Sequence, residues 1–306
     1  MGKRKRRTFV PQKNEHMEPR ILITGASGGL GGGMLDTLVE LLPANRLVAL
    51  ARKAEKVVRF AAKGVEVRLA DFDDASALER ALEGIHTLVL VPTTAPHRME
   101  QHRRVVDIAA AKGVQHILYT GVIHHDEPGH GTVIRDHQDT EAYIVASGVP
   151  HTFVRNSIYL DVLPMMLGGA SVTGEFAYPA APNGVSLASR ADMAEATARI
   201  IADPTLQGRT FALSSPRPIH YSEVAEAYAA IIGRSVHHVD IALPDYQALL
   251  VRNGVPEHFA PFLTDMARAL SEGVIRQPSD QLAELLGRTP TDVSTALRTL
   301  MQQASA

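Results

Sequence analysis

Three glycines near the start of the chain have the spacing of a phosphate-binding loop. Gly25, Gly28 and Gly31 form the pattern Gly-x-x-Gly-x-x-Gly between an apolar run and a segment of helical periodicity. The first glycine permits a tight turn, the second lets a pyrophosphate approach the backbone, and the third lets the helix pack on the strand. The N-terminus of that helix faces the anion. The flanking strand and helix favour a dinucleotide site over a bare turn, and the expected binding loop comprises Gly25, Ser27, Gly28, Gly29, Leu30 and Gly31.

The end of the second expected strand distinguishes the two nicotinamide dinucleotides. An acidic residue about 20 residues after the glycine loop would bind the adenosine ribose of NAD, but Arg52 and Lys53 stand there instead. Arg52 can pair in a bidentate way with a 2′-phosphate, and Lys53 adds charge beside it. The pattern favours NADP(H) over NAD(H), with a solvated Arg52 as the alternative. Asp71 and Phe72 follow the third strand where the adenine edge would lie, although an Asp there can also simply cap the turn.

The acid–base pair of an ordinary short-chain dehydrogenase is absent. Such an enzyme uses Tyr-x-x-x-Lys, in which the Lys lowers the pKa of the Tyr. None of the seven tyrosines has Lys four residues later: Tyr119, Tyr143, Tyr159, Tyr178, Tyr221, Tyr228 and Tyr246. An enzyme that oxidises isolated secondary alcohols is therefore not expected. The absence of Cys also excludes thiol nucleophiles, disulfides and thiolate metal sites.

Polar side chains follow the fourth and fifth expected strands. Thr93 and Thr94 come after the fourth strand, and their hydroxyl groups can reach a ribose or the pyrophosphate, or can cap the next helix. Tyr119 and Thr120 end the fifth strand, beside the expected nicotinamide. Because ligands bind at the carboxyl ends of the strands in such sheets, all four are candidate cofactor-binding residues.

A parallel sheet must position these residues. Apolar strands alternate with helical patterns in the first half of the chain, which indicates a sheet covered on both faces. The expected strands are 21–24, 46–52, 65–69, 87–91, 116–121 and 151–156. The fold class is therefore α/β, a doubly wound Rossmann fold with a smaller, partly interleaved C-terminal substrate lobe. We expect a disordered basic leader at 1–16, the NAD(P)-binding domain at 17–156 and the substrate lobe at 157–306.

Composition limits the partners of the chain. Of the 306 residues, 45% are hydrophobic and 21% are charged, as in ordinary globular proteins. The leader carries six basic residues and one acidic residue, which suits an import signal, an RNA-binding arm or a segment without function. Elsewhere acidic residues are in excess, Trp is absent and aromatic residues are sparse, so nucleic acid is not an expected partner. No apolar run is long enough to span a membrane and no secretion signal is present, so we expect a cytoplasmic protein.

A histidine-rich stretch, "VIHHDEPGHG" at 122–131, raises the question of a metal site. It contains His124, His125, Asp126 and His130. The helical His-Glu-x-x-His pattern is missing, and the stretch is loop-like. We therefore expect no metal there, but a solvated loop or a lid over the substrate.

From about residue 20 to 300 the chain resembles the NmrA-like group of atypical short-chain dehydrogenase/reductases. The likeness rests on "ITGASGGLG", on Arg52, on "DFDD" at 71–74 and on "DHQDTEAYIVASGVPHTFVRNSIYLD" at 136–161. The tail at 243–298 is similar to the subgroup of NADPH-dependent quinone oxidoreductases and triphenylmethane reductases. The stretch at 122–131 departs from that subgroup, in which small residues are expected, and this leaves the acceptor open.

The resemblance implies three residues at the reaction centre. It places a His or Lys at His137 to contact the nicotinamide ribose, and the imidazole can also polarise an acceptor. The alternative is a plain helical pair of His137 with Glu141. Asn156 and Tyr159 are similar to residues that line the acceptor pocket in the resembling reductases.

Two functions agree with these residues. The first is a reductase, because a quinone or conjugated cation accepts hydride without the help of a tyrosine and the protein then mainly orients the reactants. The second is a redox-sensing regulator of the NmrA type, which binds the dinucleotide without catalysis. The similarity of the tail favours the reductase. Its expected partner is a quinone-like small molecule, and a homodimer is one possible assembly. An isomerase or lyase is disfavoured by the missing Tyr-x-x-x-Lys.

Overall fold

Seven parallel strands form the centre of the part of the chain that the structure describes. The structure is a computed structural model and describes residues 18–124 and 132–305. In the order in which they lie side by side, the strands are β10 (Thr210–Leu213), β6 (His151–Asn156), β5 (His116–Val122), β4 (Thr87–Leu90), β1 (Ile21–Ile23), β2 (Leu47–Ala51) and β3 (Glu66–Leu69). The expected doubly wound α/β fold is therefore confirmed.

The central strands are buried because both of their faces are apolar. Every residue of β1, β2 and β5 is buried, as in parallel sheets covered by helices on both sides. The two edge strands are different. β3 exposes both of its ends, and in β10 the N–H of Ala212 donates to the side chain of Gln281 at 2.8 Å, which caps part of that edge.

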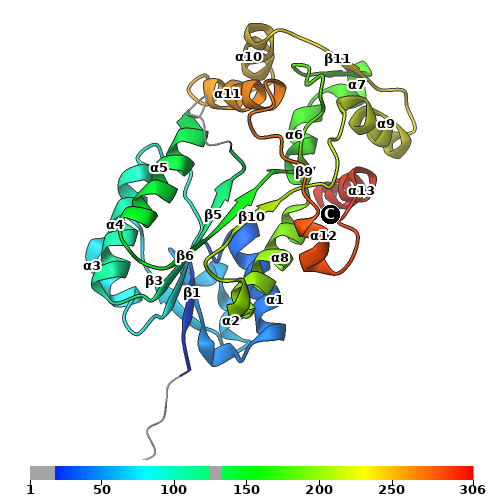
Figure 1. Ribbon diagram of the computed structural model, residues 1–306. Helices are drawn as coiled ribbons and strands as arrows, with labels where there is room; N and C mark the ends of the chain where they lie inside the picture. The colour runs from blue at the N-terminus through cyan, green and yellow to red at the C-terminus, as the bar shows by residue number, and fades with distance from the viewer. Residues whose placement is uncertain (1–17, 125–131, 306) are drawn as a thin grey trace, which may run out of the picture.

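Helices cover both faces of the sheet (Figure 1). On one side lie α3 (Ala75–Ala81), α4 (Arg98–Ala111) and α5 (Thr132–Ala146). On the other side lie α1 (Gly29–Leu41), α2 (Val58–Ala61), α8 (Arg190–Ala202) and α12 (Gln281–Leu286). α1 and α8 pack closely, because a Cβ built on Gly33 would lie only 2.9 Å from the Cβ of Ala194.

The second half of the chain builds a smaller lobe beyond the carboxyl ends of the strands (Figure 1). Its helices are α6 (Leu163–Leu167), α7 (Ala170–Thr173), α9 (Tyr221–Ile232), α10 (Leu243–Arg252), α11 (Ala260–Ser271) and α13 (Val293–Ser305). Two parallel pairs accompany them: β8 (Glu175–Ala177) with β11 (His237–Val239), and β7 (Ile158–Tyr159) with β9 (Leu187–Ala188). The 3-10 helices of the described residues are η1 (Ala44–Arg46), η2 (Ala54–Lys56), η3 (Leu160–Val162) and η4 (Pro204–Leu206).

The lobe and the sheet are interleaved along the chain. β10 and α8 come from the second half of the sequence, yet β10 lies in the central sheet and α8 packs on α1. The lobe also has an apolar core of its own, around Leu163, Phe176 and Val224. The division of the chain at residue 156 stays a prediction.

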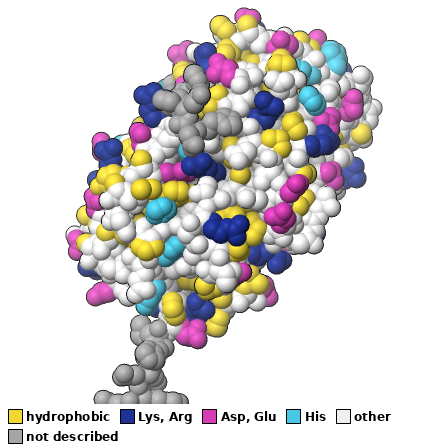
Figure 2. Space-filling model, viewed as in Figure 1, with side chains coloured by type: hydrophobic (Ala, Val, Ile, Leu, Met, Phe, Trp, Pro, Cys, Tyr) yellow, Lys and Arg dark blue, Asp and Glu magenta, His cyan; other side chains and the backbone are white. Residues whose placement is uncertain are grey.

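Charges of both signs are mixed over the face of the molecule that Figure 2 shows. Dark blue basic and magenta acidic side chains alternate there with small apolar patches. This face therefore shows no field of a single sign that would attract a polyanion.

Within the described ranges, no helix is both long enough and apolar enough to cross a membrane.

Candidate active site

A cavity of about 940 Å³ lies at the carboxyl ends of the sheet strands. It extends from the glycine loop, past the ends of β2 to β6, to α10 and α11 in the lobe. The predicted site residues that line it are Gly25, Ser27, Gly28, Gly29, Leu30, Gly31, Arg52, Asp71, Phe72, Thr93, Thr94, Thr120, His137, Asn156 and Tyr159. Two others do not line it: Lys53 is exposed outside the cavity, and Tyr119 is buried behind its wall.

The glycine loop has the conformation that its spacing predicts. Gly25 has a φ of 62°, which only glycine adopts without strain, and its carbonyl accepts the N–H of Gly28 at 2.9 Å. A Cβ built on Gly31 would overlap the carbonyl group of Gly25 and lie 2.8 Å from the carbonyl oxygen of Thr24. α1 therefore begins directly against the end of β1. The N–H groups of its first turn have no partner within the helix and suit an anion.

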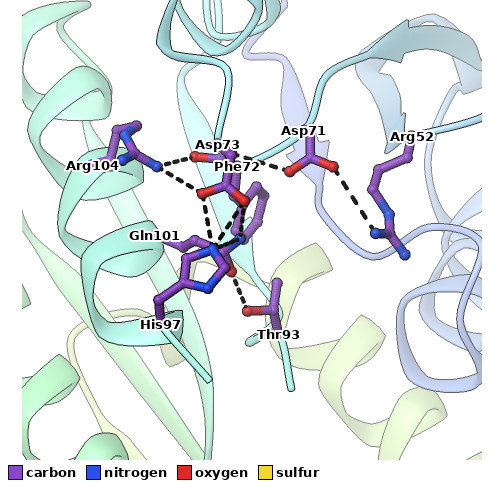
Figure 3. A network of polar contacts seen from close by, with 8 residues as sticks. All are labelled: Arg52, Asp71, Phe72, Asp73, Thr93, His97, Gln101 and Arg104. Carbon is purple, nitrogen blue, oxygen red and sulfur yellow. Dashed lines mark hydrogen bonds and ion pairs between the residues drawn. The ribbon is translucent and has the colours of Figure 1, made fainter. Parts of the chain in front are cut away.

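Figure 3 shows the polar residues at the β2–β3 end of the cavity. Arg52 Nη1 lies 3.9 Å from Asp71 Oδ2, and the Arg52 side chain is 80% exposed, so it can turn toward a ligand. Asp71 also accepts the N–H of Asp73 at 3.1 Å, which is the turn-capping contact that the sequence left open. Phe72 is buried and contributes to the cavity wall.

Asp73 ties the loop after β3 to α4 (Figure 3). Its carboxylate accepts Gln101 Nε2 at 2.8 Å and Arg104 Nη1 at 3.2 Å, and lies 3.0 Å from His97 Nε2. The hydrogen bonds from His97 and Gln101 hold the pKa of Asp73 below its usual range. Gln101 in turn accepts the hydroxyl of Thr93 at 2.6 Å through Oε1. The loops after β3 and β4 are thereby braced against one another at the cavity wall.

His137 lines the cavity from α5, and Tyr119 supports it from behind. The Tyr119 hydroxyl lies 2.7 Å from Nδ1 of His137. Burial, together with the nearby Arg98, lowers the pKa of His137 to about 3, and burial raises the pKa of Tyr119. Both side chains are therefore neutral at pH 7. When the ring hydrogen of His137 is on Nε2, Tyr119 donates to Nδ1.

Glu141, the alternative partner of His137 on the same helix, makes other contacts. Glu141 accepts hydrogen bonds from Arg155 Nε at 3.1 Å and Nη2 at 2.6 Å, and lies 3.4 Å from Nε2 of His124. Burial opposes its charge, but the hydrogen bonds from His124 and Arg155 lower the pKa of Glu141 overall. Tyr119, rather than a pairing with Glu141, is therefore what holds the His137 ring.

Asn156 and Ser157 bring unpaired polar atoms to the cavity wall. They are 2% and 3% exposed, and neither the amide of Asn156 nor the hydroxyl of Ser157 makes a hydrogen bond within the described structure. A buried polar group without a partner is costly unless water or a ligand satisfies it. Burial raises the pKa of the neighbouring Tyr159 to about 12, so this tyrosine keeps its proton. This part of the wall is suited to a polar ligand group.

Beyond these residues the cavity is apolar and aromatic. Its walls there come from η3, α6, α10, α11 and the loop after β8: Val162, Met165, Met166, Tyr178, Tyr246, Phe259, Phe262, Leu263, Met266 and Leu270. Phe259 and Phe262 stack with ring centroids 5.1 Å apart, and Tyr178 meets Tyr246 edge-on at 4.8 Å. Polarisable Met and aromatic walls suit a flat conjugated ligand.

Four polar residues of the wall do not emerge from the sequence: Arg98, Gln101, Ser157 and Arg190. Arg98 is buried and donates from Nε to Asp136 at 2.6 Å. Arg98 and Gln101 begin the helix after β4, so their position at the ligand edge of the sheet is a signal that could have found them. Arg190 begins α8, far from the glycine loop in sequence, and only the tertiary fold brings it to the cavity.

In the part of the chain that the structure describes, no group of three or more His, Cys, Asp or Glu side chains could hold a metal ion. His125, Asp126 and His130 lie outside the described residues. His124 is buried, with its Nε2 beside the Glu141 carboxylate. The predicted loop or lid at 122–131 thus stays a prediction.

The residues at the cavity fit a dinucleotide. The loop at Gly25–Gly31 leaves no room for a side chain at its close contacts, the helix N-terminus follows it, and unpaired polar atoms lie further along the wall. Together with the strand order, these features define a dinucleotide-binding protein of the Rossmann class. The chain belongs to the NmrA-like family, whose model matches residues 17–297.

Individual relatives cover almost the whole chain. Quinone oxidoreductase 2 of Escherichia coli K12 is 31% identical over 90% of this chain and 97% of its own length. The crystal structure of the NADPH-dependent quinone oxidoreductase of E. coli with NADPH has a TM-score of 0.85 at 31% identity, and covers 92% of this chain and 99% of its own. The Citrobacter triphenylmethane reductase with NADP(H) has a TM-score of 0.84 at 30% identity, with the same coverage. The expected family and subgroup are therefore confirmed.

Proposed function

We propose that the chain is an NAD(P)H-dependent reductase that transfers hydride to a quinone-like or other conjugated small molecule. The observation that carries this proposal is that one continuous cavity has two parts. The glycine loop at 25–31 forms the dinucleotide cradle, and the walls from η3, α6, α10 and α11 form an apolar chamber; the two parts meet at His137 and Asn156. A protein that only senses the dinucleotide needs the cradle alone. Relatives named quinone oxidoreductase and, at 26% identity, NAD(P)H azoreductase of Xenophilus azovorans support a reductase.

In this proposal the cavity wall divides between the parts of the cofactor. The glycine loop at 25–31 binds the pyrophosphate, and Arg52 with Lys53 binds a 2′-phosphate. Asp71 and Phe72 contact the adenine. Four further residues contact the ribose and nicotinamide: Thr93, Thr94, Thr120 and His137. Tyr119 acts at this end only through His137, because it is buried behind the cavity wall and its hydroxyl is hydrogen-bonded to the His137 ring.

The reaction needs few groups from the chain. When bound, the reduced nicotinamide supplies the hydride. The apolar chamber orients the acceptor and excludes water, while the Nε2–H of His137 and the amide of Asn156 donate hydrogen bonds to the acceptor oxygen as charge develops on it. Tyr159 lines the same wall as a neutral hydroxyl. The weakly basic product oxyanion takes its proton from bulk water as the product leaves the cavity, so no Tyr-x-x-x-Lys unit is required.

The preference for NADPH is assigned to Arg52. We expect Arg52→Gln to weaken NADPH binding about tenfold or more and to leave NADH binding unchanged, because a hydrogen bond between charged groups contributes about 1.5–3 kcal/mol. Calorimetric titration of the protein with each dinucleotide measures both affinities. Lys53→Gln is the matched control, and its effect is expected to stay within about threefold because an exposed Lys acts only as a screened point charge. Equal affinity of the unaltered protein for NADH and NADPH would show the preference to be wrong.

The proposed activity is tested with a panel of acceptors. NADPH oxidation, followed by the loss of its absorbance, is expected to exceed the protein-free rate with at least one small quinone, azo or triphenylmethane compound. The same panel without added acceptor is the control for oxidation by dissolved oxygen. Tight binding of both NADPH and NADP⁺ without turnover of any acceptor would instead support the redox-sensing regulator.

A further inference from the structure

Arg190 extends from the first turn of α8 to the glycine loop. Its guanidinium lies so close to α1 that a Cβ built on Gly29 would be 2.7 Å from Nη1 and 2.9 Å from Cζ. The Arg190 side chain is 37% exposed and lines the same cavity as the loop. A cation therefore faces the N-terminus of α1 from an element that is distant in sequence.

Asp161 of η3 sets the direction of this guanidinium. Its Oδ1 accepts Arg190 Nε at 3.1 Å and Nη2 at 2.7 Å, and its Oδ2 accepts the backbone N–H of Arg190 at 3.0 Å. These contacts occupy one edge of the guanidinium. The remaining nitrogen, Nη1, is the guanidinium atom nearest to the position of a Cβ on Gly29. The planar fork is thus fixed by one carboxylate, and three of its five N–H groups, two on Nη1 and one on Nη2, are left for a second acceptor.

We propose that Arg190 is a clamp for the cofactor pyrophosphate, which it holds against the first turn of α1. The inference rests on the proposed dinucleotide site, because the glycine loop places the anion between the free N–H groups of α1 and Nη1 of Arg190. An Arg is suited to this position, since it donates to phosphate oxygens while its other edge stays bonded to a carboxylate. Asp161 is the positioning residue that aims the clamp.

The clamp also connects the cofactor to the acceptor wall. Asp161 follows Tyr159 by two residues, and the Arg190 guanidinium lies over the Tyr159 ring at 5.7 Å from its centroid. The same short segment, β7 and η3, thus contacts both the pyrophosphate clamp and the apolar chamber.

Ligands with and without the pyrophosphate separate this role from a structural one. NADPH and 2′-phospho-ADP-ribose contain the pyrophosphate, whereas adenosine 2′-monophosphate lacks it. We expect Arg190→Gln to weaken the first two about tenfold or more and to leave the third within about twofold, when affinities are measured by calorimetry. Arg190→Lys, which keeps a point charge without the fork, is expected to recover part of the loss.

Two further variants make the comparison decisive. Asp161→Asn keeps the shape of the side chain but loosens the aim of the guanidinium, and is expected to weaken the same two ligands by about three- to tenfold. Arg52→Gln is the converse control, because it should weaken adenosine 2′-monophosphate, which Arg190→Gln spares. Thermal unfolding without ligand checks that each variant is folded.

The outcomes are separable. Loss of affinity for all three ligands in equal proportion, or NADPH affinity of Arg190→Gln within twofold of the unaltered protein, would overturn the clamp. Failure of the unaltered protein to bind NADPH would overturn the proposed dinucleotide site itself, because that result does not depend on Arg190. The clamp is supported if Arg190→Gln keeps its affinity for adenosine 2′-monophosphate and loses affinity for NADPH and 2′-phospho-ADP-ribose.

Discussion

Gly31→Ala is expected to impair the use of the cofactor strongly and to destabilise the fold. The new methyl group would overlap the carbonyl of Gly25 and lie 2.8 Å from the Thr24 oxygen, and both are backbone atoms that cannot turn away. α1 must therefore move from the end of β1, at a cost of about 1–3 kcal/mol in the free energy of unfolding. A displacement of about 1 Å at the loop lowers kcat/KM for NADPH on the order of a hundredfold. Urea unfolding and steady-state kinetics measure the two effects.

Gly169→Ala is the matched control for that experiment. It also adds one methyl group, but Gly169 has an ordinary φ of −78° and no atom within 4 Å of the new position. Its stability is expected to be unchanged or higher by about 0.4–1 kcal/mol, since the unfolded chain loses conformational freedom. If Gly31→Ala behaved like Gly169→Ala in both measurements, the close contact between strand and helix would not be what shapes the site.

His137→Leu is expected to lower kcat by about 10²–10³, the usual cost of removing one donor to a developing oxyanion. NADPH affinity should fall by less than about tenfold, because the ribose has other contacts. His137→Gln places an amide N–H near the position of Nε2 and is expected to restore much of the rate. A loss of kcat that is the same for Leu and Gln, or a loss confined to NADPH affinity, would contradict the role as donor to the acceptor.

The pH profile gives an independent check of the same residue. The pKa of His137 lies near 3, below its usual range, so the protonated form is disfavoured and the ring stays neutral as the pH falls from 8 to 5. We expect kcat to show no histidine inflection in that interval. An inflection near pH 6.5 that disappears in His137→Gln would show that the imidazole works as a proton donor instead.

Tyr119→Phe removes the hydrogen bond to the His137 ring and is expected to lower kcat by about tenfold.

The sequence predicts those parts of the site that depend on local order. Gly25 and Gly31 are recognisable because a strand and a helix flank them, and Arg52 because it ends the next strand. The fold class follows in the same way from apolar strands that alternate with helices. Asn156 is identified by the family resemblance, and the structure adds that its amide is buried without a partner.

What the sequence does not predict depends on contacts between distant segments. Arg190 is an ordinary Arg at the start of a helix until α8 packs on α1 and brings it to Gly29. The pairing of Tyr119 with His137 joins a strand to the following helix, while the nearer candidate Glu141 is taken by Arg155. Periodicity places a residue on a face of its element, but it does not decide which of several polar partners is reached first.

The position of α8 and β10 has a consequence for the synthesis of the chain on the ribosome. When residue 156 leaves the exit tunnel, six strands of the sheet have been made, but α1 still lacks the helix that packs over Gly33. The side of α1 that faces α8 at Gly33 thus stays uncovered until residues 190–202 have also emerged. The nucleotide half therefore completes its packing only after this later segment of the chain has been made, rather than when its own last strand is finished.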